Sequence, residues 1–293
     1  MPTPLKPGEL IYVDHKIKPA DYAMPSMQAA YDHYSMGYLV SGDRKWFSYE
    51  TVQIGHSGNA GISKPNIFHR NLPMSDLPYD RYLIKFKIEV LKPVIDLIGE
   101  DNFDKICMHY LDFSLESSKN IEQQFEDMYQ KYTKNTPYSQ FILQGMLQRL
   151  VLTVYQEYLP FDNTVLEFKT TDSRIHESLI YIEKNLEYSP TLYEAAAHAS
   201  LSPSHFSRLF KEVTGCSYTD YVTSIRLQHA CILLGKTDLS ISEIALKVGF
   251  SNGNYLATVF KNKYNCSPKD FRKNISTCGT AKYAALANGD IYL

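Results

Sequence analysis

The sequence predicts an α+β fold, with a β-barrel or jelly roll first, a helical connector next, and an all-α domain with two helix-turn-helix units last. Three observations predict it. Between residues 33 and 89, short apolar stretches alternate with glycine and proline turns, which is typical of closely spaced strands. Residues 115–158 carry apolar residues at helical spacing. Residues 174–273 contain a pair of short helices around a break, and this pair occurs twice.

The strand-rich region predicts a first domain over residues 1–112, which begins with a proline-containing arm at residues 1–9. Within this region the stretch Tyr38-Leu39-Val40 predicts a strand that ends at a Ser-Gly-Asp turn. A later stretch alternates apolar and polar residues, which predicts a strand with one buried face and one face in solvent. Its apolar positions are Tyr82, Ile84, Phe86 and Ile88, and its polar positions include Lys85 and Lys87.

The connector, residues 113–160, is expected to form two antiparallel helices over 115–132 and 138–158. The apolar positions are Ile121, Phe125, Met128 and Tyr132 in the first helix and Phe141, Ile142, Leu147, Leu150, Val151 and Val154 in the second. These stripes can pack on each other and on the strand domain. A remaining face can pair with a second copy of the chain, and purely intramolecular packing is the alternative. A linker over 159–172 follows.

The last domain is expected over residues 172–275, followed by a small-residue tail at 276–293. In its first unit, Leu201-Ser202-Pro203 separates two helices, with Ser202 as the cap. In its second, Gly249 ends one helix and Ser251 or Asn252 caps the next. The units repeat with a period of about 50 residues. The matches are Phe210-Lys211 with Phe260-Lys261 and Gly215-Cys216-Ser217 with Asn265-Cys266-Ser267.

The second helix of a helix-turn-helix enters the DNA major groove. LSPSHFSRLFKEVTGCSYTDYVTSIRLQHACILL followed by ISEIALKVGFSNGNYLATVFKNKYNCSPKDFRK resembles the paired helix-turn-helix domain of AraC/XylS-type transcription regulators. The resemblance implies that a central helix joins two units, which read successive groove segments on one face of the DNA. It covers roughly residues 174–273.

The resemblance also implies roles for individual residues. Base edges would be read by Ser204, Ser207 and Arg208 in the first unit, and by Asn254, Ala257 and Thr258 in the second. Many relatives carry arginine where Thr258 stands, so the second unit is expected to read sequence weakly. The DNA phosphates would be contacted by Lys211, Lys261 and Lys263. The alternative for each of these residues is a solvated helix face.

The strand domain resembles, more loosely, the cupin-type sensing domain that precedes the paired helix-turn-helix in this family. The resemblance rests on YLVSG, the glycine turns that follow, and SKPNIFHR. It implies a small-molecule effector, frequently a sugar, bound inside the barrel. Tyrosine and tryptophan suit a sugar because each combines an apolar ring with a polar edge. The candidate residues are Tyr38, Trp46, His69 and Tyr82, for which ordinary core packing is the alternative.

A metal enzyme is the least favoured interpretation of the strand domain. His33 and His69 can meet in space, but a third ligand is not evident, and two histidines are few for a stable metal site. The sequence also shows no nucleophile motif and no phosphate-binding glycine loop. We therefore expect no cofactor, no metal and no enzymatic activity.

Charge and cysteine content add weaker indications. Residues 172–275 carry 12 Lys+Arg and 10 Asp+Glu, a small basic excess for a DNA-binding domain. Affinity is therefore expected to depend on the placement of charge, on dimerisation, or on both. No signal peptide and no membrane-spanning apolar run is evident. The five cysteines are scattered, which fits a reducing, cytoplasmic location: Cys107, Cys216, Cys231, Cys266 and Cys278.

These observations predict a cytoplasmic, sequence-specific transcription regulator. It would bind double-stranded promoter DNA, as a homodimer, and respond to a small-molecule effector, for which a sugar is the leading candidate. Activation through contact with RNA polymerase is implied by the family resemblance alone, and the residues do not separate it from repression. The alternatives are an effector-independent DNA-binding protein whose barrel serves only dimerisation, and a cupin-type metalloenzyme with a helical appendage.

Overall fold

The structure is a computed structural model that describes residues 5, 9–30, 33–65, 67–158, 171–264 and 266–278. The strands are β1 (Ile11–Lys18), β2 (Tyr34–Ser41), β3 (Arg44–Ser48), β4 (Val52–Gly55), β5 (Ala60–Ser63), β6 (His69–Pro73), β7 (Tyr79–Phe86) and β8 (Tyr110–Leu111). The helices of the first half are η1 (Ile88–Leu91), α1 (Lys92–Ile98), α2 (Glu100–Lys105), α3 (Leu115–Lys134) and α4 (Ser139–Glu157). Those of the second are α5 (Thr171–Lys184), η2 (Leu186–Tyr188), α6 (Leu192–His198), α7 (Pro203–Thr214), α8 (Tyr218–Lys236), α9 (Ile241–Lys247), α10 (Gly253–Tyr264) and α11 (Pro268–Cys278). The expected arm, most of the linker and most of the tail lie outside the described residues.

The strands form two antiparallel sheets, with the orders β1-β7-β2-β5-β8 and β4-β3-β6. The expected barrel closure is not confirmed, because no strand pairing in the described part of the chain joins the two sheets. The chain crosses from β2 to β3 through Gly42, whose φ of 83° suits glycine. A Cβ at this position would come within 2.6 Å of the Pro78 carbonyl oxygen. This tight turn directs β3 into the second sheet.

The two faces of β7 have different surroundings. Tyr82, Ile84 and Phe86 are buried in a core that also contains apolar residues of α3 and α4. Lys85 points to the opposite face, where solvent was expected, yet its side chain is only 4% exposed. That expectation was wrong because the opposite face is also covered, and the ammonium of Lys85 lies 5.5 Å from the centre of the Tyr12 ring. Ile88 begins η1 and does not extend the strand.

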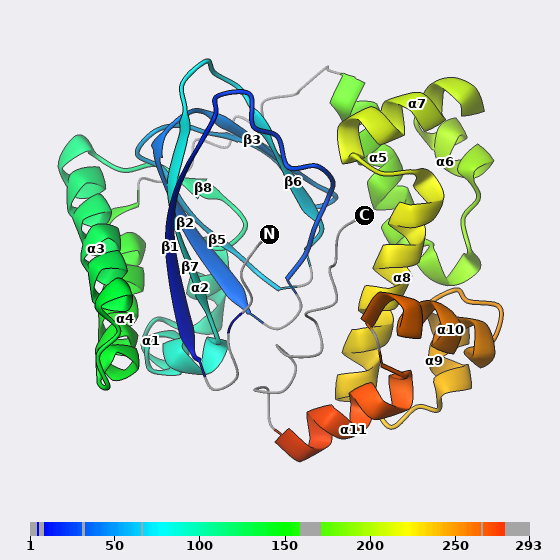
Figure 1. The fold of residues 1–293 in the computed structure, drawn as a ribbon. Helices are drawn as coiled ribbons and strands as arrows, with labels where there is room; N and C mark the ends of the chain where they lie inside the picture. The colour runs from blue at the N-terminus through cyan, green and yellow to red at the C-terminus, as the bar shows by residue number, and fades with distance from the viewer. Residues whose placement is uncertain are drawn as a thin grey trace.

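Helices α3 and α4 pack side by side against the outer face of the larger sheet (Figure 1). Their bounds lie within two residues of those expected. The buried stripe of α4 consists of Leu143, Leu147, Leu150, Val151 and Val154. Phe141 and Ile142 were expected in this stripe, but they are 80% and 38% exposed. Phe141 lies about 180° around the helix from Leu150, so it points away from the core.

The second half of the chain is helical and lies on the other side of the sheets, nearest to β3 and β6 (Figure 1). Helix α8 crosses between two small cores. One is formed mainly by α5–α7 and the first part of α8, and the other by α9–α11 with the last part of α8. Helical spacing along α10 predicts a core position for Tyr255, together with Leu256 and Phe260, but its side chain is 54% exposed. The centre of its ring lies 5.7 Å from that of Phe250, in an edge-to-face contact.

The first helical core continues into the strand domain. Met27, Phe47 and Phe68 belong to the same apolar cluster as residues of α5, α7 and α8. The ring of Phe68 lies 6.1 Å from that of Tyr221, edge to face. The two halves therefore share buried apolar surface, which couples the packing of the strand domain to that of the first helical unit.

Candidate nucleic-acid interface

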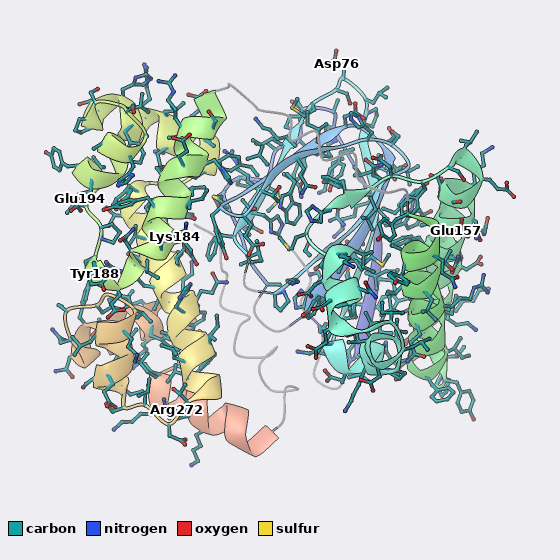
Figure 2. All side chains as sticks on the ribbon, turned by 180° about the vertical axis from the view of Figure 1, so that it is seen from behind. Asp76, Glu157, Lys184, Tyr188, Glu194 and Arg272 are labelled. Atoms are coloured by element: carbon teal, nitrogen blue, oxygen red, sulfur yellow. The ribbon has the colours of Figure 1, made fainter. Side chains whose placement is uncertain are left out.

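Both helical units begin with the same cap. Thr191 accepts a hydrogen bond from the Glu194 amide before α6, and Ser240 accepts one from the Glu243 amide before α9. The glutamates return the contact by accepting from the cap amides at 2.7 and 2.8 Å. These reciprocal bonds satisfy amides that the first turn of a helix leaves free. Glu194 lies on the side of the helical half away from the strand domain (Figure 2).

Both units also turn in the same way after their first helix. Ser200 has a φ of 53° and Gly249 a φ of 85°. The next amide in each unit bonds back five residues, from Leu201 to Ala196 O at 2.9 Å and from Phe250 to Ala245 O at 2.8 Å. The first helix of each unit therefore ends in a left-handed conformation, as the sequence predicts for the second unit from Gly249. A Cβ at Gly249 would come within 2.3 Å of the Leu186 carbonyl oxygen, so the position also requires the absence of a side chain.

The second helices start at equivalent caps. Ser202 accepts from the His205 amide at the start of α7, and Pro203 follows it. Asn252 accepts from the Tyr255 amide at 2.8 Å before α10, which resolves the choice between Ser251 and Asn252. The repeat extends further, because Ser217 and Ser267 cap α8 and α11 through the amides of Asp220 and Asp270. The internal repeat of about 50 residues is confirmed.

Helix α7 separates its polar and apolar residues cleanly. Phe206, Leu209, Phe210 and Val213 are buried. The predicted DNA contacts Ser204, Ser207, Arg208 and Lys211 are all exposed on the other side. Arg208 makes no hydrogen bond or ion pair with another described residue. Its guanidinium is therefore available to a ligand, and it can bond two acceptors on one base edge.

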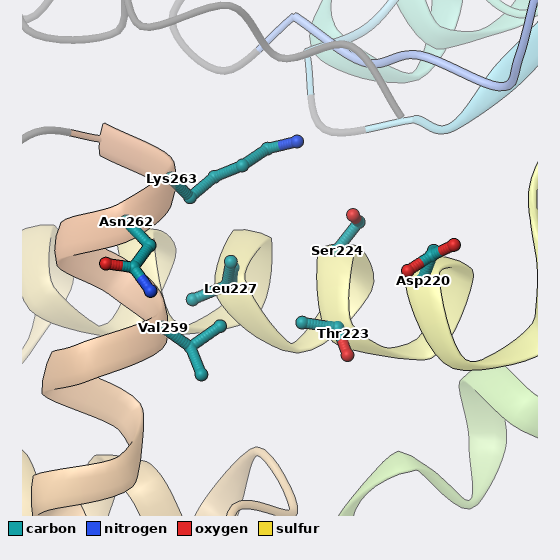
Figure 3. A pocket seen from close by; sticks show the side chains of 7 residues that line it. All are labelled: Asp220, Thr223, Ser224, Leu227, Val259, Asn262 and Lys263. Atoms are coloured by element: carbon teal, nitrogen blue, oxygen red, sulfur yellow. The ribbon is translucent and has the colours of Figure 1, made fainter.

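Helix α10 presents a less basic face. Asn254, Thr258 and Lys261 are exposed, and Ala257 is half-buried. The Thr258 hydroxyl donates to the Asn254 carbonyl at 3.0 Å, so it is already used within its own helix. Figure 3 shows Lys263 on α10 and Asp220 on α8 at opposite ends of a cleft between these two helices. Burial lowers the pKa of Lys263, and the carboxylate of Asp220 opposes this effect. Lys263 thus differs from the exposed Lys261.

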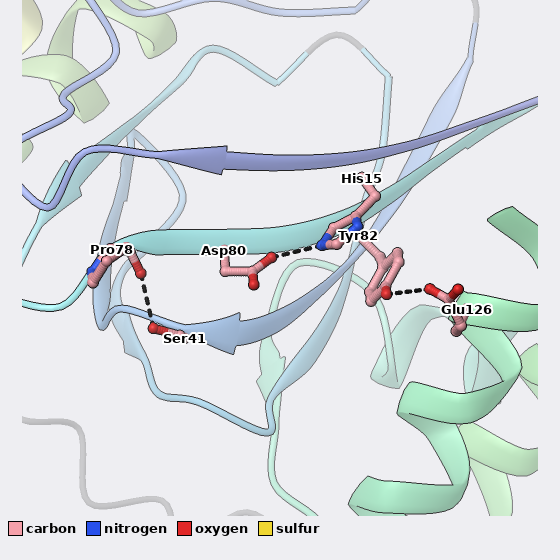
Figure 4. Close-up of polar contacts among 6 residues, drawn as sticks. All are labelled: His15, Ser41, Pro78, Asp80, Tyr82 and Glu126. Atoms are coloured by element: carbon pink, nitrogen blue, oxygen red, sulfur yellow. Dashed lines mark hydrogen bonds and ion pairs between the residues drawn. The ribbon is translucent and has the colours of Figure 1, made fainter.

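The four predicted effector residues fall into two separate pairs. Trp46 and His69 stack within the smaller sheet, with ring centres 3.9 Å apart and planes at 9°, and burial lowers the pKa of His69 to about 4. Tyr38 and Tyr82 lie on the outer face of the larger sheet. There Tyr38 contacts Ser118 and Glu122, and Tyr82 donates to Glu126 of α3 (Figure 4). The two pairs therefore lie on different sheets. The rings of Tyr38 and Tyr82 are on the outer face of the larger sheet, because side chains alternate between the two faces along a strand.

Sequence reasoning missed a contact between the two halves. Arg70 of β6 donates from Nη1 to the carbonyl oxygens of Glu212 and Val213, at 2.6 and 2.7 Å. It also donates from Nε to Met24 O at 2.7 Å, and the Met27 amide donates to Thr214 O at 2.8 Å. These carbonyls end α7. The alternation of side chains along β6 could have indicated this contact, because it places Arg70 on the opposite face of the strand from His69.

Among the described residues, no group of three or more His, Cys, Asp or Glu is placed to hold a metal ion. None of the helices in the same part of the chain is long and apolar enough to cross a membrane.

Residues 195–274 match a family described as a helix-turn-helix domain. A solved transcriptional regulator from Chromobacterium violaceum, described as containing an AraC-type DNA-binding domain, is 28% identical and covers 37% of this chain and 97% of its own, with a TM-score of 0.35. Over residues 195–274 the chain carries a helix-turn-helix domain of the matched family, which runs from α6 to α11.

Two curated proteins are also similar to this chain. The regulatory protein PocR of Salmonella typhimurium is 36% identical over 105 residues, which is 36% of this chain and 35% of PocR. An uncharacterized HTH-type transcriptional regulator of Staphylococcus aureus is 25% identical over 243 residues, 81% of this chain and 31% of the relative. The chain therefore spans about a third of the length of these curated relatives.

Proposed function

We propose that this chain is a transcription regulator that binds promoter DNA through α7 and α10 and responds to a small molecule bound by its strand domain. One observation carries the DNA-binding part. Two helices with exposed polar faces follow the same cap and the same turn, about 50 residues apart, on either side of α8. This arrangement suits two successive major-groove contacts.

The two helices would contribute unequally to specificity. Arg208 of α7 would bond the two acceptors of a guanine, with Ser204 and Ser207 beside it. On α10, Asn254 would bond adenine, while the Thr258 hydroxyl is already occupied by a carbonyl of its own helix. Lys211 and Lys261 would bind phosphates and so set position without reading sequence. The first half-site should therefore be the more stringent one.

Effector response would pass through β6. His69 and Arg70 are adjacent on this strand and point to opposite faces, His69 towards Trp46 and Arg70 towards the end of α7. A ligand that displaces β6 would therefore alter the contact between Arg70 and α7. This is a coupling between two binding sites through one strand. A sugar or sugar derivative is the proposed effector class.

The remaining partners follow from the same proposal. The weak basic excess of the helical half favours a homodimer, because two linked DNA modules raise the effective concentration of each other. The exposed Tyr138 and Phe141 of the α4 end, 74% and 80% exposed, are the proposed contact with the second copy. Activation through RNA polymerase is the proposed regulatory outcome, and no enzymatic activity is proposed.

Selection of duplexes from a random pool by the purified full chain tests the DNA-binding proposal. The expected result is an enriched site with two short elements about 10 base pairs apart, since successive major-groove segments on one face are one helical turn apart. A chain carrying Arg208→Ala should lose the preference at one position of the stronger element. Selection that enriches no sequence would overturn the proposal.

A further inference from the structure

The inner face of the larger sheet is polar. Tyr82, Ile84 and Phe86 of β7 face α3 and α4, so the intervening positions face the other way. Their neighbours in register are known from the pairing of β7 with β1 and β2. The inner positions are mostly polar, with Leu39 and Leu83 as apolar exceptions; they are Tyr12, Asp14 and Lys16 on β1, Ser35, Gly37 and Leu39 on β2, and Tyr79, Arg81, Leu83 and Lys85 on β7. An antiparallel sheet shows such a polar face when that face meets solvent or a polar ligand.

The smaller sheet meets this inner face through direct contacts. The guanidinium carbon of Arg44, on β3, lies 4.2 Å from the centre of the Tyr79 ring. The Tyr110 hydroxyl of β8 donates to Asn71 Oδ1 of β6 at 3.3 Å. The Tyr110 amide donates to Gln53 Oε1 of β4 at 2.9 Å. The region between the sheets is therefore enclosed by side chains of both.

Arg44 is buried in this region with part of its hydrogen-bonding capacity unused. The residue is 1% exposed. Its Nη2 donates to Tyr22 O at 2.6 Å and approaches Asn71 O at 3.4 Å. Its Nε has no hydrogen-bond partner in the part of the chain that the structure describes. Among the described residues, no ion pair joins Arg44 to a carboxylate, and burying a guanidinium without a counter-ion is costly.

Two further donors in the same region are also buried and unpartnered. They are Nη1 of Arg81 and Nε1 of Trp46. Arg81 belongs to the same cluster as Arg44, because its guanidinium carbon lies 5.7 Å from the centre of the Tyr79 ring. Trp46 lies two residues after Arg44 on β3, on the same face of the strand. All three atoms are donors for which the described residues supply no acceptor.

The acidic side chain on the inner face does not supply that charge. The carboxylate of Asp14 is 2.8 Å from the ammonium of Lys16. Burial lowers the pKa of Arg44, and the nearby charge of Arg81 adds to this effect. Two guanidinium groups around one tyrosine ring repel each other unless an anion lies between them. The cation–π contact with Tyr79 offsets only part of this cost.

Gly37 leaves a small open position on the same face of the sheet as Arg81. A Cβ added at Gly37 would have a single heavy atom within 4 Å, the Tyr82 carbonyl oxygen at 3.7 Å. Gly37 pairs with Leu83, and Leu39 pairs with Arg81. The open position at Gly37 is therefore two residues along the sheet from the Arg81 side chain and on the same face. A ligand group can therefore approach Arg81 over Gly37 without displacing a side chain at that position.

We infer that the region between the sheets binds a small hydroxylated metabolite that carries a carboxylate or a phosphate. Arg44 and Arg81 donate to the anionic group, as planar guanidinium groups do to both kinds of oxyanion. The Trp46 indole donates to an oxygen elsewhere on the ligand. This inference rests on the proposed sensing function and narrows its ligand class from sugars in general to acidic sugar derivatives.

A purely structural role for the arginines makes a different prediction. Arg44 bonds Tyr22 and Asn71, so Arg44→Met is expected to lower stability whether or not a ligand binds. Arg81→Met removes the unpartnered donor without breaking a hydrogen bond of Arg44. Arg149, exposed on α4, provides the matched control Arg149→Met. The Arg81 variant therefore separates ligand binding from folding.

Thermal unfolding and titration calorimetry of the full chain test the inference with named probes. The probes are D-glucose, D-gluconate, D-glucuronate, D-glucose 6-phosphate, acetate and inorganic phosphate. We expect either the sugar carboxylates, gluconate or glucuronate, or the sugar phosphate, glucose 6-phosphate, to raise Tm. Which of these probes raises Tm shows whether the ligand carries a carboxylate or a phosphate. Arg81→Met should weaken that binding at least tenfold, and Arg149→Met should leave it unchanged.

Other outcomes overturn the inference in distinguishable ways. If glucose bound as tightly as its acidic derivatives, and Arg81→Met left the affinity for these ligands unchanged, the anion site would be refuted. The proposed sensing function would remain. If acetate or inorganic phosphate bound as tightly as the acidic sugar derivatives, the proposal that the ligand is hydroxylated would be refuted. Binding of none of the probes would refute this ligand class. Duplex selection by the same chain reports separately on DNA binding.

Discussion

Arg70 of β6 donates a hydrogen bond to the main-chain carbonyl of Val213, 2.7 Å away, in the last turn of α7. The last carbonyls of a helix lack partners within the helix and carry partial negative charge, so a guanidinium is favourable there. The same Nη1 also bonds Glu212 O. One side chain of the strand domain thus binds the end of the helix that is proposed to read DNA.

Replacing Arg70 should loosen the contact between the two halves. We expect the Met27 amide, which donates to Thr214 O at 2.8 Å, to exchange its hydrogen faster in Arg70→Met. Losing hydrogen bonds to a charged group costs about 1.5–3 kcal/mol, which corresponds to roughly ten- to hundredfold faster exchange if opening requires this contact to break. Hydrogen exchange resolved at Met27 measures it. Arg149→Met is the control, and equal rates in the two variants would contradict the assignment.

Gly215 makes another contact between the halves, and it allows a matched comparison. Its φ is 82°, and an added Cβ would lie 2.1 Å from the Pro25 carbonyl oxygen. Gly249 has a φ of 85°, and its Cβ would meet Leu186 O within the helical half. Left-handed strain costs about 1–3 kcal/mol in either case. We expect both alanine variants to lower Tm, but Gly215→Ala alone to speed exchange at Met27. Equal exchange in both would show that Pro25 does not hold Gly215.

Local signals made the helical half predictable from its residues. The Thr191 and Glu194 pair marks a helix start by spacing alone, and Gly249 marks a helix end by its backbone freedom. The repeat then placed Arg208 on an exposed face. Helical spacing alone does not say how wide the buried stripe is, which is why it places Tyr255 in the core although this residue is exposed.

The strand domain was less predictable because its contacts are distant in sequence. Alternation separated the two faces of β7 correctly, yet it could not say that Lys85 would be covered as well. Tyr38 and Trp46 were assigned to one pocket, but their sheets and faces depend on pairings that no local signal encodes. Arg70 lay within the stretch that suggested a sensing domain, and its partner is more than 140 residues away.

Arg208→Ala should relax DNA specificity at one position. A bidentate contact to guanine discriminates by about 1–3 kcal/mol, so affinity for the selected site should fall by that amount while affinity for unrelated duplexes changes little. Lys211→Ala should instead weaken all duplexes similarly and reduce the salt dependence of binding by about one ion. Fluorescence anisotropy at several salt concentrations measures both. If the two variants behaved alike, Arg208 would be a phosphate contact.

His69 should make stability depend on pH below neutrality. Its pKa in the folded chain is lowered to about 4 by burial, from 6.5. The unfolded chain therefore binds one more proton between these values, and stability falls as pH decreases, by up to about 1.4 kcal/mol per pH unit from this group. Urea unfolding of the full chain at pH 7 and pH 5 measures the loss. His69→Gln keeps a neutral polar group against Trp46 and should show a smaller loss between the two pH values. An identical loss in both proteins would mean that other histidines account for the effect, such as His109 and His176, whose pKa values burial also lowers.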